Sequence, residues 1–265
     1  MKVWITRAVV LLGLLAVGWV LDALLAPRGL RWIVWTLAAI VLGVFALELI
    51  LRGRRRRRER ADRARWRAAM EDPKARRAAI RELRARIDAA RRLGPRLRVR
   101  HARLATTLAE LHEAEGDGDA AVRVLARVPA EDLEPLQEAV IRLARAQAYL
   151  HGGDADGADA TLGPLPGTTG EPAVDASLRL ARAAVALERG EPDAALAVAR
   201  DVADRAAAHD ALFDEAKALE AACRDARGEP TEARAALDAL DETGRRRLRR
   251  IGSARVRALL ERRTG

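Results

Sequence analysis

Residues that could perform catalysis are few and scattered. Four histidines lie in different predicted helices, without the spacing of a metal site or a catalytic pair: His101, His112, His151 and His209. Neither Ser177 nor Ser253 lies in a Gly-x-Ser-x-Gly frame, and no Gly-rich loop is followed by a lysine that could hold phosphate. The single cysteine, Cys223, excludes an internal disulfide and favours a small buried residue. We therefore predict a non-enzymatic protein with no cofactor and no metal.

A register of glycine and small residues recurs four times in the second half of the chain. Its glycines, spaced by 37, 37 and 38 residues, are Gly116, Gly153, Gly190 and Gly228. Alanine stands seven residues before each glycine and five residues after it, at Ala109, Ala146, Ala183, Ala221 and at Ala121, Ala158, Ala195, Ala233. Glycine suits the end of a helix, and small residues let two helices cross closely. The register predicts stacked helical hairpins over residues 96–128, 133–165, 172–202 and 211–240.

This register resembles the tetratricopeptide repeat, which has a small residue, a glycine, an alanine and a large apolar residue in the same order. The resemblance covers roughly residues 97–241. The period exceeds the family's length of about 34 residues, and the family's aromatic in the first helix is missing. Another helical-hairpin repeat and a single irregular bundle remain as alternatives. The resemblance implies an α-solenoid whose first helices line a groove for a protein partner, at Arg103, Glu110, Leu143, Gln147, His151, Leu180 and Glu188.

The N-terminal segment is apolar in two stretches, residues 3–25 and 32–51. Each is long enough to cross a hydrocarbon core of about 30 Å as a helix. A cleaved signal peptide is the competing interpretation, but Leu24 and Pro27 would flank its cleavage site after Ala26 unfavourably. The sequence predicts an uncleaved two-helix transmembrane hairpin over residues 1–51.

A strongly basic segment follows, because residues 52–103 carry a net charge of +16. Its densest run is predicted to contact anionic lipid headgroups through Arg54, Arg55, Arg56, Arg57 and Arg58. The positive-inside rule places this side, and with it the N-terminus and the repeats, in the cytoplasm. Binding of nucleic acid is the alternative, although Trp66 is the only aromatic that could stack on a base. Asp72 and Pro73 predict the start of a new helix.

The repeats and the C-terminal segment have net charges of opposite sign. Residues 104–241 carry a net charge of −15, whereas residues 242–265 carry +7. The apolar spacing of the latter predicts one helix over residues 245–263 that caps the array with a polar outer face. The expected domains are thus a transmembrane hairpin (1–51), Arg-rich juxtamembrane helices (52–94), four repeats (95–241) and a C-terminal capping helix (242–265).

The predicted fold class is all-α: a transmembrane helical hairpin followed by a tetratricopeptide-like α-solenoid. This layout is similar to that of HemY-type bacterial inner-membrane proteins, which would place the chain in the plasma (inner) membrane. The expected function is a membrane-anchored scaffold that recruits a protein partner to the cytoplasmic face, without a small-molecule substrate. The alternative is a membrane-tethered regulator that binds nucleic acid through the Arg-rich segment.

Overall fold

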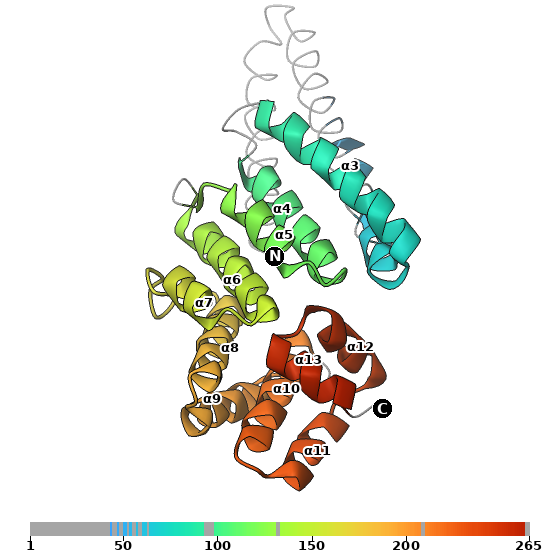
Figure 1. Cartoon of the computed structure of the whole chain (residues 1–265). Coiled ribbons are helices and arrows are strands. Elements are labelled where there is room, and N and C mark those ends of the chain that lie inside the picture. The colour runs from blue at the N-terminus through green and yellow to red at the C-terminus, as the bar shows by residue number, and fades with distance from the viewer. Residues whose placement is uncertain are drawn as a thin grey trace, which may run out of the picture. The chain divides into compact units, whose positions relative to one another are not determined.

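The computed structural model describes residues 43, 47, 50, 51, 53, 54, 57, 60–62, 64–92, 98–130, 133–207 and 210–262. All regular elements in these ranges are helices, which confirms the predicted all-α class (Figure 1). The chain divides into two compact units, Met1–Arg65 and Trp66–Gly265. The described part of the chain contains no helix that is both long and apolar enough to cross a membrane. The predicted span 3–25 and most of the span 32–51 lie outside the described residues.

The second unit begins with the helix predicted from Asp72 and Pro73. Helix α3 spans Pro73–Arg92, and the Asp72 carboxylate accepts a hydrogen bond from the backbone N–H of Lys74 at 2.9 Å. Its apolar face, with Leu83 at the centre, is buried against the next helix, α4. This packing joins α3 to the first repeat.

The four predicted hairpins form, each from two helices that pack on each other. Their bounds are α4 (Arg98–Glu113) with α5 (Gly118–Ala126), α6 (Pro135–Gly152) with α7 (Ala155–Leu162), α8 (Pro172–Glu188) with α9 (Pro192–Arg205), and α10 (Ala211–Ala226) with α11 (Pro230–Asp238). The first helices α4, α6, α8 and α10 contact one another in sequence, and each second helix packs against the next hairpin. The hairpins therefore stack into a solenoid-like array.

The small-residue register works as the spacing predicts. The four glycines adopt positive φ, between 75° and 85°, a conformation that costs residues with a Cβ atom more than it costs glycine. All eight alanines of the register are buried, and Ala146 and Ala195 are fully inaccessible. The acid after each glycine stands at the N-cap of the second helix, where Asp117 and Asp154 accept a backbone N–H. Each hairpin turn is thus fixed by its own sequence.

An arginine eight residues before the glycine joins successive hairpins. Arg145 donates to the carbonyl of Leu125, and Arg182 donates to that of Leu165, both at 3.0 Å. These carbonyls lie at the C-terminal end of the preceding hairpin, where the last helical turn leaves its acceptors unpaired. The fourth hairpin has Glu220 at the equivalent position.

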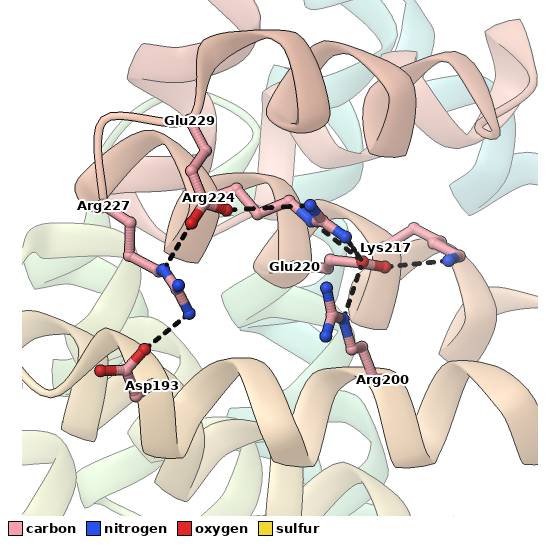
Figure 2. Close-up of polar contacts among 7 residues, drawn as sticks. All are labelled: Asp193, Arg200, Lys217, Glu220, Arg224, Arg227 and Glu229. Atoms are coloured by element: carbon pink, nitrogen blue, oxygen red, sulfur yellow. Dashed lines mark hydrogen bonds and ion pairs between the residues drawn. The ribbon is translucent and has the colours of Figure 1, made fainter.

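Glu220 is buried and surrounded by cations instead (Figure 2). Lys217 and Arg224 from its own helix contact the carboxylate at 2.9 and 3.0 Å, and Arg200 reaches it from α9 at 3.3 Å. Burial alone would raise the pKa of Glu220, but the hydrogen bonds from Lys217 and Arg224 outweigh it and lower the pKa. The cluster connects the third hairpin to the fourth.

The prediction of one C-terminal helix over residues 245–263 is wrong. Two helices form, α12 (Glu242–Ile251) and α13 (Ala254–Arg262). The break occurs because Gly252 is extended, with ψ of 165°, and the Ser253 hydroxyl then accepts the backbone N–H of Val256. Helix α12 contacts α10 and α4, while α13 contacts α10 and α6. The two helices fold back onto the array rather than capping its end as a single helix.

Candidate partner-binding groove

One face of the array is lined by all four first helices. We call it the inner face: the side of α4, α6, α8 and α10 that faces α12 and α13 (Figure 1). A cavity of about 220 Å³ lies there. It is open to solvent on one side and is lined by residues of α4, α6, α8, α10, α12 and α13, namely Glu110, Glu113, Gln147, Leu150, Ser177, Leu180, Ala181, Ala184, Glu215, Ala218, Leu219, Leu248, Ile251 and Val256, with Gly252 and Ser253 from the α12–α13 break.

Three of the predicted groove residues meet at this cavity. Glu110 of α4, Gln147 of α6 and Leu180 of α8 all line it. His151 lies beside it in a buried position, and its Nδ1 is 3.1 Å from the Gly252 carbonyl oxygen. Burial and the nearby Arg257 lower the pKa of His151 despite that contact. His151 thus holds the α12–α13 break against α6.

The other predicted groove residues do not line the cavity. Arg103 is exposed on α4, and Glu188 is half-buried near the end of α8. Leu143 is buried in the core formed by the second and third hairpins. The cavity is thus lined by first helices of the hairpins, but by only three of the seven predicted groove residues.

Sequence reasoning missed two acidic residues of the lining, Glu113 and Glu215. Glu113 lies three residues after Glu110, which places both on one face of α4. Glu215 stands thirteen residues before its glycine, the same offset as Arg103 in the first hairpin. Extending the groove positions by one helical turn in every repeat would have found both residues.

Three acidic residues, Glu110, Glu113 and Glu215, line the cavity. Glu113 is only 7% exposed, and burial together with the charge of Glu110 raises its pKa to about 8, although Arg257 opposes the shift. Burial also raises the pKa of Glu215, even with Arg247 nearby. Glu110 is an exposed residue at the edge of the lining, and partial burial of its carboxyl raises its pKa as well.

The C-terminal hairpin α12–α13 is held on the inner face mainly by arginines. Arg247 pairs with the buried Asp214 at 3.5 Å, and Arg262 pairs with Asp225 at 2.7 Å. Arg255 donates to the carbonyl of Leu187, and Arg257 to that of His151. Because these partners come from α6, α8 and α10, the basic hairpin binds across three repeats.

Gly244 permits the close approach of α12. A Cβ atom on Gly244 would lie 2.5 Å from a carboxylate oxygen of Asp214, nearer than such atoms can approach. Asp241 is the N-cap of α12, and its carboxylate accepts the Gly244 N–H at 2.6 Å. The acidic face of α10 therefore fits this glycine closely.

The structure describes two of the five arginines that are predicted to contact lipid headgroups. Arg54 and Arg57 are helical and exposed, whereas Arg55, Arg56 and Arg58 lie outside the described residues. Leu47, Ile50 and Leu51, just before them, are helical and each more than half exposed.

A second cavity, of about 360 Å³, lies between α3, α4 and α5, and its lining includes Arg84, His101, Arg123 and Arg127.

Comparison with known proteins assigns neither a family nor a binding partner to the chain. No protein-family model, curated protein or solved structure matches the chain. Within the described ranges, no three side chains of the metal-binding types come together as a metal site. Cys223 is fully buried, as its position predicts, and burial raises its thiol pKa to about 12.

Proposed function

We propose that this chain is a membrane-anchored, non-enzymatic scaffold whose tetratricopeptide-like array recruits a protein partner to the cytoplasmic face of the membrane. The observation that carries the recruiting role is the inner face. The first helices of the four successive hairpins present side chains to one cavity. These side chains include three of the seven positions expected from the resemblance. Solenoids bind partners through such extended faces.

The chain's own C-terminus indicates how this face holds a helix. Helices α12 and α13 are basic and amphipathic, and they bind the inner face through apolar contacts of Leu248 and Val256 together with arginine pairs. Laying an amphipathic helix into a groove is a recurring mode of recognition. A partner segment of similar chemistry would fit the same face.

The anchoring role rests on the N-terminal sequence. Two apolar stretches of sufficient length precede the arginine run. Leu47, Ile50 and Leu51 lie at positions that share one helical face, and their exposure supports contact with lipid or with another apolar helix. Arg54 and Arg57, one to two turns later, are exposed and would contact lipid headgroups in this proposal.

Site-specific photo-crosslinking in native membranes tests the recruiting role. A photoreactive residue at Glu110, on the inner face, should capture a protein. The same residue at Glu232, exposed on α11, is the matched control and should not. Equal capture at both positions would overturn recruitment by the inner face. Capture of nucleic acid, lost after nuclease treatment, would favour the alternative function.

Reporter fusions test the anchor and its orientation. An enzyme that is active only outside the cytoplasm should be silent when fused after residue 265 and active in the link at residues 26–31. The ten arginines at positions 52–67 outnumber the two in the link, and moving such a cluster outward would cost about 2.3 kcal/mol per charge per 100 mV. Activity at residue 265 would place the array outside the cytoplasm.

A further inference from the structure

Glu113 is a buried residue whose carboxyl group lies at the wall of the inner-face cavity. Its side chain is 7% exposed and lines the inner-face cavity. Neither a hydrogen bond nor an ion pair to Glu113 is present among the described residues, whereas its counterpart Glu220 contacts three cations. A carboxylate in such a poorly hydrated position is disfavoured unless a cation or a hydrogen-bond donor contacts it. This carboxyl group therefore calls for a functional explanation.

The cavity has the lining of a site for a small organic cation. Its acidic residues, Glu110, Glu113 and Glu215, are not accompanied by any lysine or arginine in the lining. The remaining wall is largely aliphatic, with Leu150, Leu180, Leu219 and Val256. The volume of about 220 Å³ is below the range of about 300–1,000 Å³ that is usual for ligand pockets, so a small group fits better than a large ligand.

A divalent metal fits this lining less well. Calcium requires about six to eight oxygen ligands and magnesium a near-ideal octahedron. The carboxylates of the cavity do not converge closely enough to form a metal site within the described ranges. An ammonium group needs only a few acceptors, and the carbon chain that carries it would contact the leucines.

We propose that the inner-face cavity binds a primary ammonium group, with the Glu113 carboxylate as its counter-ion, Glu110 at the solvent side and the leucines around the alkyl chain. The ammonium belongs either to a free alkylamine or to a lysine side chain of the protein partner. The second source rests on the proposed function; the first does not.

Binding of the cation is coupled to loss of one proton. The pKa of about 8 keeps the empty Glu113 protonated at pH 7, so the incoming ammonium forms an ion pair as the carboxyl proton leaves to solvent. The charges that act on Glu113 are Glu110 on α4 and Arg257 on α13. From the other packed helices, Glu215 of α10 lines the cavity, Arg247 of α12 acts on Glu215, and His151 of α6 has a lowered pKa. On the α3 and α5 side, Arg84, Asp117 and Arg123 act on the neighbouring His112.

Calorimetric titration of the purified full-length chain with n-pentylammonium tests the proposal. Affinity should rise about tenfold between pH 6 and 7 and less than twofold between pH 8 and 9, as expected for displacement of one proton from a group with this pKa. Heats measured at pH 7 in two buffers of different ionisation enthalpy should report about one proton released. The neutral analogue pentan-1-ol should bind at least about tenfold more weakly, a difference of about 1.4 kcal/mol.

Substitutions assign the counter-ion. Glu113→Gln keeps the shape of the neutral side chain and should weaken pentylammonium binding at least about tenfold, with loss of proton release. Glu188→Gln, on the inner helix α8 but outside the lining, is the matched control and should bind like the original chain. Equal affinity for pentylammonium and pentan-1-ol, or unchanged binding by Glu113→Gln, would overturn the proposal. If Glu113→Gln does not fold, absence of proton release by the original chain at pH 7 would overturn it alone.

Competition distinguishes the two sources of the ammonium. Pentylammonium added to the Glu110 photo-crosslinking experiment should prevent capture of the partner if a partner lysine occupies the cavity. Capture that persists at saturating pentylammonium assigns the cavity to a free alkylamine. Absence of any capture would contradict the recruiting role while leaving the calorimetric result intact, so the two proposals fail separately.

Discussion

Glu220 and Glu113 are both buried glutamates on the first helix of a hairpin, and the protein treats them in opposite ways. Glu220 receives hydrogen bonds from Lys217, Arg224 and Arg200 at the junction between the third and fourth hairpins (Figure 2). Glu113 faces a cavity and has no such donor. The pKa of Glu220 is lowered, whereas that of Glu113 is raised to about 8.

This difference distinguishes a carboxylate that stabilises the fold, Glu220, from a carboxyl group that we propose binds a ligand, Glu113. A buried ion cluster is tolerated when hydrogen bonds replace the lost hydration, and it then fixes the geometry of the groups that form it. A buried carboxyl without a donor weakens the fold above its unfolded pKa. Such a group is expected where function, rather than stability, determines the residue.

Removing the Glu220 carboxylate should produce the largest loss. We expect Glu220→Ala to lower the free energy of unfolding by about 3–4 kcal/mol, because Lys217 and Arg200 lose their carboxylate partner and Arg224 keeps only its longer contact with Glu229, at 3.8 Å. Since the pKa of Glu220 is lowered in the folded state, its stabilisation is present above the unfolded pKa and disappears as the pH falls through the folded pKa. Urea unfolding between pH 3 and 7 measures both effects.

The control is Glu232→Ala, at an exposed position on α11, which should change stability by less than about 0.5 kcal/mol. A similarly small effect at Glu220 would show that water solvates the three cations, and the contrast with Glu113 would lose its basis.

Neutralising Glu113 should have the opposite sign. In the folded state Glu113 keeps its proton up to a pH of about 8, whereas an unfolded glutamate loses it near 4.3, so stability falls as the pH rises between these values. We expect Glu113→Gln to raise the free energy of unfolding by about 3 kcal/mol at pH 8, and by much less at pH 4. Unfolding curves at the two pH values, with Glu188→Gln as control, provide the measurement.

Loss of stability in Glu113→Gln at pH 8 would contradict this expectation. It would mean that the ionised carboxylate has a cationic partner in solution, and Glu113 would then resemble Glu220.

The predictions for Glu220 and Glu113 assume that each hairpin is held together where its two helices cross at buried alanines, and not by the inner face. Ala183 and Ala195 are buried in the third hairpin, at 4% and 0% exposure. We expect Leu at either position to lower the free energy of unfolding by about 2 kcal/mol through overpacking. Glu188→Ala on the same hairpin should be nearly silent. Thermal melts that rank these variants in the reverse order would place the crossing elsewhere.

The sequence predicts the hairpins well because their determinants are local. A glycine with positive φ, an acid at the next N-cap and alanines at fixed offsets define each turn within about twenty residues. The start of α3 at Pro73 and the burial of Cys223 are equally local and are confirmed.

The C-terminal hairpin was not predictable in the same way. Its break at Gly252 is completed by His151, which lies 101 residues earlier in the chain. The lack of a donor for Glu113 likewise depends on where α12 and α13 come to rest, because they supply Leu248 and Val256 rather than a lysine to the cavity wall. Register alone could have placed Glu113 on the inner face, but it could not have shown that the carboxyl group is unpaired.

A substitution at Gly244 tests whether the packing of α12 against α10 keeps Glu113 buried. It is expected to cause the smallest change in stability. The added Cβ of Gly244→Ala would meet the Asp214 carboxylate, so α12 must move away from α10. We expect a loss of about 1 kcal/mol, since alanine favours the helix while the contact with α10 loosens. The solvent exposure of Glu113 would then increase, and its pKa would fall toward its ordinary value. The decline of stability between pH 5 and 8 should therefore become shallower in Gly244→Ala than in the original chain. Thr243→Ala, the neighbouring exposed position on α12, is the control and should keep the original slope. An unchanged slope in Gly244→Ala would show that α4 and α10 alone bury Glu113, and that the C-terminal hairpin does not close the site.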